Sequence, residues 1–294
     1  MQAELSLLQR AAIQPLARLD KNTLTVSRLE AALLNLWPRN TAESWDKTGL
    51  LVGDPNTSIE GIALALDPTL AAIKEAKRLG ANVLITHHPV YLEAQEGFYP
   101  AGKGVSHVQA AIYEAIKQGL ALMCFHTALD VSLEARKALP NLLYLEYRGI
   151  LEPLDEFPHL GYGQVCTPYE CDKPLSLEHL AARCLASFGR MPRVWGRPNT
   201  RIETVVTTTG SAGSMASLCL DRGIDCLICG EIKYHNALEA QELGLCIIDL
   251  GHDVSELPLV DVMADTLRAC GLEDARVIIL DQSNNWTCPD AYRL

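Results

Sequence analysis

The sequence predicts an α/β protein (α+β in the broad sense), and two observations support that class. Short apolar runs alternate with helical patterns along most of the 294 residues, which is typical of βα units around a parallel or mixed sheet. The apolar fraction of 48% and the charged fraction of 21% are those of an ordinary globular protein. A chain of this length buries a sizeable core, either as one large domain or as two intertwined ones.

The individual elements follow from apolar runs and from their boundary residues. Strands are predicted over 61–66, 81–86, 120–125, 162–167, 203–208, 225–229, 244–250 and 276–280. Helices are predicted over 26–36, 68–79, 104–118, 175–188, 213–223, 233–243 and 256–270. Thr25 or Ser27 can cap the first helix, and glycines such as Gly80 and Gly119 stand where helices should stop.

Residues 141–174 interrupt this alternation. They are rich in Pro, Gly and Tyr and predict an irregular linker with one or two strands, between a first α/β half over 25–140 and a second over 175–294. Residues 1–24 predict an N-terminal helical extension, because they lack the features of a signal or transit peptide. No apolar stretch has the length and purity of a membrane span, so a cytoplasmic location is expected.

Charge and cysteine content exclude two further classes. A net charge of −11 leaves no basic surplus for nonspecific nucleic-acid binding. The ten cysteines are dispersed, many of them within apolar runs, which indicates reduced, buried thiols. Cys226 and Cys229 stand three positions apart in a predicted strand and would face opposite sides. A redox or zinc pair is therefore rejected there.

Histidines and carboxylates gather where predicted strands end. Three such loops carry two of these residues each. The first has His87 and His88, the second has His126 and Asp130, and the third has His252 and Glu256. Because ligands bind at the carboxyl ends of strands in open α/β sheets, these loops are expected to converge. Imidazoles and carboxylates without a thiolate suit Zn, Mn, Fe, Co or Ni, and they support two metals that share a bridging carboxylate and water.

His87 and His88 are adjacent, and neighbouring side chains in a strand point to opposite faces. Beyond the strand end that alternation stops, so both imidazoles can turn toward one point. Pro89 keeps His88 away from helical geometry and makes the turn rigid.

The segment from His252 to Pro258 has two interpretations. If it is helical, His252 and Glu256 share one face, because they are four residues apart. Alternatively, Ser255 caps a helix with Pro258 in its first turn, and His252 precedes that helix. Asp253 is a competing carboxylate that we expect to face solvent.

The Gly/Ser loop over 207–214 leads from a predicted strand into a predicted helix. Its backbone N–H groups could bind phosphate. A plain strand-to-helix turn explains the same residues at least as well.

Six short motifs, taken in order, resemble the NIF-three-like family, the type 2 homologues of GTP cyclohydrolase I. They are WDKTGLLVG at 45–53, LDPT at 66–69, ITHHP at 85–89, HTALD at 126–130, GEIKYH at 230–235 and GHDVSE at 251–256. The resemblance runs from about residue 25 to near the C-terminus. Lys47 departs from it, since the family usually carries Asn at that position.

The resemblance implies a NIF-three-like fold, with two interlocked α/β halves and mixed sheets, and a dinuclear metal site. Position by position, the family's ligands fall on His87, His88, Asp130, His252 and Glu256. The resemblance also implies a homo-oligomer, a hexamer built from two trimers.

The function expected from these residues is that of a metal-dependent hydrolase acting on a nucleotide or another phosphorylated small molecule. Two divalent ions per chain would hold a bridging hydroxide and polarise the substrate. His126 or His235 could move protons or orient the substrate, and Glu231 is a further candidate base. The alternative is a non-catalytic metal-binding, metal-trafficking or regulatory protein. A third option is that the metals are purely structural and hold the two halves together.

Overall fold

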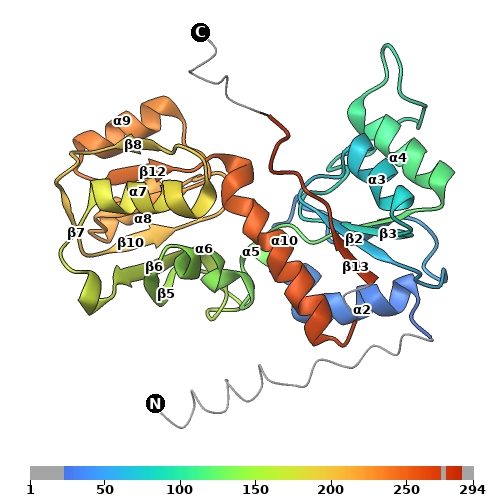
Figure 1. Ribbon diagram of the computed structural model, residues 1–294, viewed down its shortest axis with the longest axis horizontal. Helices are drawn as coiled ribbons and strands as arrows, with labels where there is room; N and C mark the ends of the chain where they lie inside the picture. Colours follow the sequence, from blue (N-terminus) through green and yellow to red (C-terminus); the bar gives the residue numbers. More distant parts are fainter. Residues whose placement is uncertain (1–22, 273–275, 287–294) are drawn as a thin grey trace. The chain divides into compact units, whose positions relative to one another are not determined.

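The chain folds into two compact units (Figure 1), in a computed structural model that describes residues 23–272 and 276–286. Unit 1 holds the described residues up to Ala128 together with those of Met263–Leu280. Unit 2 holds Leu129–Val262 and the described residues from Asp281 onward. The chain passes between the units within α5 (Thr127–Asp130) and α10 (His252–Ala269).

Unit 1 is built on a five-stranded sheet in the order β1-β4-β3-β2-β13. The strands are β1 (Gly49–Val52), β2 (Ile62–Ala65), β3 (Val83–Thr86), β4 (Ala121–Cys124) and β13 (Val277–Ile279). All neighbours are parallel except β1, which runs antiparallel to β4. The carboxyl ends of β2, β3 and β4 therefore meet at one edge of the sheet.

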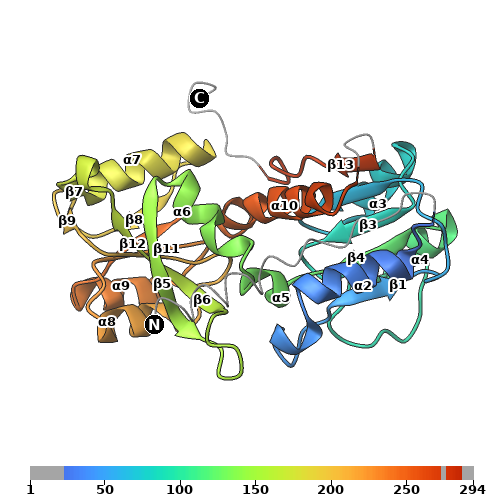
Figure 2. The same cartoon turned by 90° about the horizontal axis from the view of Figure 1, so that it is seen from below.

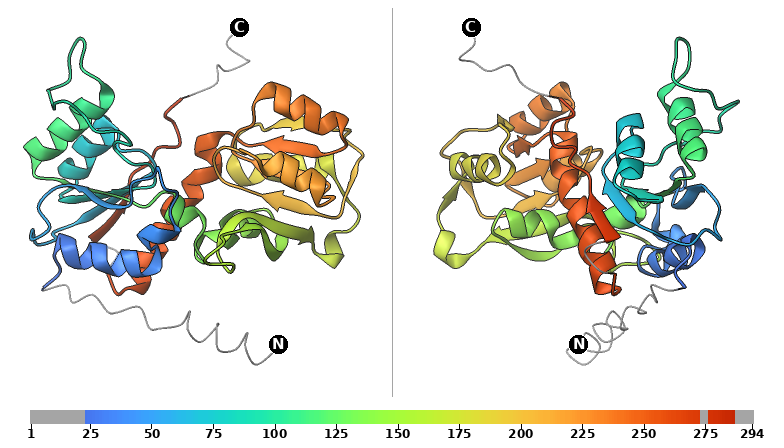
Figure 3. Two further views of the ribbon diagram at one scale, coloured as in Figure 1. Left: turned by 180° about the vertical axis from the view of Figure 1, so that it is seen from behind. Right: turned by 45° about the vertical axis from the view of Figure 1, so that its right-hand side comes forward.

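Helices α3 (Leu70–Arg78) and α4 (His107–Gln118) pack together over one face of this sheet (Figures 1 and 3). Strands β2, β3 and β4 are buried along their whole length, which is why they are continuous apolar runs in the sequence. Helix α2 (Val26–Leu36) is capped by Thr25, whose hydroxyl accepts from the Arg28 N–H. Gly119 ends α4 in the left-handed conformation.

Unit 2 is built on a six-stranded sheet in the order β5-β6-β10-β11-β12-β8, beside a small pair formed by β7 and β9. The bounds are β5 (Leu145–Pro153), β6 (Gly161–Pro168), β7 (Leu175–Ser176), β8 (Arg193–Trp195), β9 (Arg201–Ile202), β10 (Val205–Thr207), β11 (Cys226–Cys229) and β12 (Cys246–Asp249). Strands β10, β11 and β12 are parallel, so their carboxyl ends also share one edge.

Helices cover both faces of the unit 2 sheet, with α7 (Leu177–Phe188) on one side and α8 (Met215–Asp221) and α9 (Tyr234–Glu242) on the other (Figure 2). Cys226 packs in the core cluster of α7, and Cys229 packs in the cluster of α8 and α9. The prediction that these two thiols face opposite sides is confirmed. The described cysteines are all free, and among them Cys171 is exposed.

The predicted α/β class with mixed sheets is confirmed, and each helix and strand predicted between residues 26 and 280 has its counterpart. The helical extension predicted over 1–24 lies outside the described residues, which begin at Thr23. The elements that the sequence pattern missed are short or lie at edges: β1, β5, β7, β8, β9, α5, α6 (Ala138–Leu142) and the 3-10 turns Arg39–Thr41, Ala135–Lys137 and Glu170–Asp172. Residues 141–174 contain the antiparallel pair β5 and β6. Among the helices that the structure describes, none combines the length and hydropathy needed to cross a membrane.

Candidate metal centre

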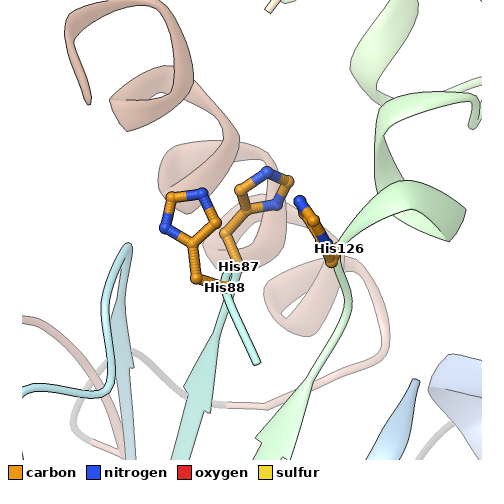
Figure 4. A group of neighbouring side chains, drawn as sticks. All are labelled: His87, His88 and His126. Atoms are coloured by element: carbon orange, nitrogen blue, oxygen red, sulfur yellow. The ribbon is translucent and has the colours of Figure 1, made fainter. Parts of the chain in front are cut away.

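Three histidines of unit 1, His87, His88 and His126, form an imidazole cluster at the carboxyl ends of β3 and β4 (Figure 4). One ring nitrogen from each lies within 4.8 Å of the others. The ring centroid of His87 lies 5.1 Å from that of His88 and 5.1 Å from that of His126. The prediction that the loops after these two parallel strands converge is therefore confirmed within unit 1.

The backbone after β3 explains how two adjacent imidazoles share one place. The His87 and His88 N–H groups donate to the carbonyls of Ala65 and Leu66, which extends the pairing with β2 beyond the strand. The Thr86 hydroxyl donates to the His88 carbonyl at 2.7 Å and closes the turn. The two rings are tilted by 50° to each other.

Each imidazole of the cluster has an oxygen acceptor at Nδ1. The pairs are His87 with the Phe125 carbonyl at 3.2 Å, His88 with Asp67 Oδ1 at 2.8 Å, and His126 with Asp46 Oδ1 at 3.1 Å. A carbonyl or a carboxylate can only accept, so Nδ1 carries the proton and Nε2 carries the lone pair. Metal-binding histidines in proteins have this arrangement. The donor set therefore fits a divalent transition metal.

Asp46 is the most firmly held of these acceptors. Its side chain is completely buried, and its Oδ2 accepts from both the backbone N–H and the hydroxyl of Thr127. Burial raises the pKa of Asp46, but the hydrogen bonds from His126 and Thr127 outweigh it and hold the pKa at about 2. The carboxylate thus stays ionised, and it fixes the tautomer of His126.

A second group in unit 2, the carboxylate cluster, consists of Asp130 on α5, Glu231 after β11, and His252 and Glu256 in the first turns of α10 after β12. Glu231 Oε1 lies 3.3 Å from His252 Nδ1, and Glu256 Oε2 lies 3.2 Å from His252 Nε2. Asp130 accepts from the Thr209 hydroxyl at 3.0 Å. Glu256 is 3% exposed, so its carboxylate is held inside unit 2.

The helix α10 begins at His252, so the helical interpretation of this segment is the correct one. His252 and Glu256 stand one turn apart on the same face. Ser255 does not cap the helix: its hydroxyl donates to the His252 carbonyl and accepts from the Gly210 N–H at 2.9 Å. Pro258 lies inside the helix.

Glycines bring the backbone of unit 2 close to these side chains. Gly210 has φ +58°, and a Cβ there would collide with the Glu256 carboxylate. A Cβ at Gly230 would collide with the Ser255 hydroxyl and the Gly210 carbonyl. The Gly210 N–H is committed to Ser255 and the Ala212 N–H to the Glu231 carbonyl. The loop over 207–214 is thus a strand-to-helix turn that supports Glu256.

Asp249 and Asp253 lie near the carboxylate cluster in the sequence, but their carboxylates accept hydrogen bonds from other groups of unit 2. Asp249 accepts from the Ile232 and Gly251 N–H groups and holds the loops that carry Glu231 and His252. The expectation that Asp253 faces solvent is wrong. Its carboxylate accepts from Arg190 at 2.7 Å and from the Trp286 indole N–H at 3.1 Å, and the side chain is only 18% exposed.

The predicted proton-transfer residues lie in different surroundings. His126 belongs to the imidazole cluster, and Glu231 contacts His252. His235 is exposed near the start of α9, with its ring 5.4 Å from that of Tyr234. Asp46 and Asp67 are functional residues that the strand-end pattern did not predict. A signal for both was present, since Asp67 stands two residues after the end of β2 and both aspartates lie in recognised motifs.

The family assignment rests on a family model and on individual relatives. The model described as Duf34/NIF3 (NGG1p interacting factor 3) matches residues 24–285. A "GTP cyclohydrolase 1 type 2 homolog" of Streptomyces coelicolor is 31% identical over 255 residues, which cover 82% of this chain and 85% of the relative.

Solved structures share the fold. A Staphylococcus aureus protein matches with a TM-score of 0.81 and 23% identity, covering 92% of this chain and all of that one (100%). A Bacillus cereus protein related to NIF3 matches with a TM-score of 0.77 and 18% identity, covering 88% and 97%. The resemblance seen in the six motifs is confirmed, and the chain belongs to the Duf34/NIF3 family.

Proposed function

We propose that this protein is a metal-dependent hydrolase that acts on a nucleotide or another phosphorylated small molecule. The observation that carries the proposal is the imidazole cluster, in which every Nδ1 is held by an oxygen acceptor. Relatives named "GTP cyclohydrolase 1 type 2 homolog" add support for hydrolytic chemistry on a nucleotide.

We propose that residues of both clusters act as ligands of two divalent ions per chain. The ions would be Zn, Mn, Fe, Co or Ni. The proposed ligands are His87, His88, Asp130, His252 and Glu256. Imidazoles and carboxylates together suit these ions. Asp130 follows His126 by four residues in the chain, within the recognised motif at 126–130. Bound ions would supply Lewis acidity, activating water and polarising the electrophilic centre of the substrate.

The chain's own residues would handle the protons. His126 donates from Nδ1 to an ionised Asp46, which leaves the lone pair on Nε2, the atom that would accept a proton from water or substrate. Glu231 would serve either as a second base or by orienting His252 through Nδ1. His235, exposed on α9, would orient the substrate.

The family resemblance also supports a homohexamer, formed as a dimer of trimers. Light scattering on the purified protein measures the mass directly. A mass near six chains supports this assembly, whereas a monomer contradicts it.

The experiment that tests the hydrolase combines metal analysis with a substrate screen. Protein is purified without added metal, its metal content is determined, and it is assayed against nucleotides, sugar phosphates and phosphodiesters. We expect turnover that chelation abolishes and metal restores. If the protein retains two metals per chain but turns over none of these compounds, the binding or trafficking alternative replaces the hydrolase.

A further inference from the structure

Trp45 is an exposed aromatic side chain next to the imidazole cluster, and the proposed function gives it no role. We propose that its indole is a stacking surface for a planar heterocyclic ring of the substrate. This inference rests on the proposed function, and it narrows the substrate from phosphorylated small molecules in general to those that carry such a ring.

The position of Trp45 is the first argument. Its side chain is 52% exposed, and its ring contacts that of His126 edge to face, with centroids 5.6 Å apart and planes at 68°. His126 in turn lies 5.1 Å from His87 and 5.4 Å from His88. A ring stacked on Trp45 would therefore lie next to the group that we expect to move protons.

The rigidity of the segment is the second argument. Asp46, the next residue, is buried and accepts two hydrogen bonds from Thr127 and one from His126. The Glu43 N–H donates to the Thr127 hydroxyl at 2.9 Å. Both sides of Trp45 are thus tied to the strand end that carries His126, so its exposure comes from a fixed loop.

The chemistry of the indole is the third argument. A large apolar ring left half in water costs hydrophobic free energy that burial would recover. Fixed, exposed aromatic rings bind nucleobases through their π-faces, and the interaction is tolerant of base identity because every base has such a face. An aliphatic substrate has no π-face to stack on the indole. We therefore propose a planar heterocycle.

Binding measurements on the full chain test the inference without requiring turnover. Guanosine and adenosine serve as ring probes, ribose 5-phosphate serves as the ringless probe, and calorimetry gives the affinities. We expect Trp45→Leu to weaken nucleoside binding about tenfold or more, and Trp45→Phe to retain most of it. Binding of ribose 5-phosphate and the metal content should stay within twofold of wild type.

Tyr99→Leu is the matched control, because Tyr99 is a 54% exposed ring of the same unit that lies against Gly97. It should leave all three affinities unchanged. The inference is overturned if neither nucleoside binds the wild-type protein, if Trp45→Leu binds both normally, or if Trp45→Leu instead lowers the oligomer mass. If nucleoside binding depends on Trp45 but the protein turns over no substrate, the inference holds and the hydrolase proposal fails. If turnover is the same in wild type and Trp45→Leu, the hydrolase proposal holds and the inference fails.

Discussion

The imidazole cluster of unit 1 follows the parallel strands β3 and β4, and Glu231, His252 and Glu256 of the carboxylate cluster follow the parallel strands β11 and β12 of unit 2, yet the two clusters are built differently. In unit 1 the side chains are held by partners: a carbonyl and two carboxylates accept from the three Nδ1 atoms. In unit 2 they are held by close backbone approach, since Gly210 and Gly230 leave room for Glu256 and Ser255. The first cluster should therefore be sensitive to loss of a partner, and the second to added volume.

The two clusters also differ in charge. Three imidazoles bring neutral donors, whereas Asp130, Glu231 and Glu256 bring negative charge that offsets that of divalent ions. We expect the carboxylates to contribute most to the affinity for any divalent ion. The imidazoles should favour transition metals over Mg²⁺ and Ca²⁺.

The largest effect is predicted for Glu256→Gln, which keeps the shape of a buried side chain and removes its charge. Metal affinity should fall by more than the roughly 100-fold that loss of an outer partner costs, as measured by competition with a chelating dye. The exposed Glu242→Gln on α9 is the control and should bind as wild type. Equal affinities for both variants would remove Glu256 from the ligand set.

Added volume is tested by Gly210→Ala. The new methyl group would collide with the Glu256 carboxylate, at a residue whose φ is +58°, so the free energy of unfolding should fall by about 2–4 kcal/mol. Gly213→Ala has a similar φ of +50° but nothing within 4 Å of the new Cβ, and should cost about 1 kcal/mol. Urea titration measures both. Similar losses would mean that close packing at Gly210 does not matter.

Loss of a partner in unit 1 is tested by Asp67→Asn. The amide no longer presents an ionised acceptor to His88 Nδ1, so metal affinity should drop about 10- to 100-fold while the overall fold persists. Asp155→Asn in an exposed position is the control. An unchanged affinity for Asp67→Asn would show that this carboxylate does not tune His88.

The smallest effect concerns the metal-free protein. Because the pKa of Asp46 is lowered to about 2 from 3.8, its ionised form stabilises the fold by about 2 kcal/mol above pH 4, and that stabilisation is lost as the pH falls toward 2. Asp46→Asn should therefore unfold more easily than wild type at pH 7, with the difference shrinking in acid. A difference that is constant from pH 7 to pH 2 would refute this.

The central strands were predictable because they are buried along their whole length, and helices such as α4 and α7 because glycines end them. The edge strand β5 was not, since residues such as Glu146 and Arg148 give it a polar pattern on the exposed side. The start of α10 was ambiguous because Ser255 and Pro258 imitate a cap and a first turn. Only tertiary contacts show that Ser255 serves the Gly210 loop instead.

The candidate ligands were visible in sequence because each follows an apolar strand. Asp46 and Asp67 stand in the recognised motifs, but their pairing with a particular histidine was not predictable, because Asp46 lies 80 residues before His126 and Asp67 lies 21 before His88. Such pairings arise only when separate loops meet at one sheet edge. The burial of Asp253 was not predictable for the same reason, since its partners Arg190 and Trp286 come from distant parts of the chain.

The metal content of a variant that lacks His87 and His88 is the decisive measurement for the proposed metal site. The double variant His87→Ala/His88→Ala is purified beside wild type and beside His107→Ala, an exposed histidine at the start of α4, and all three are analysed for metals. We expect the wild-type protein and His107→Ala to carry metal and the folded double variant to carry almost none. Two metals per chain retained in the double variant would contradict it.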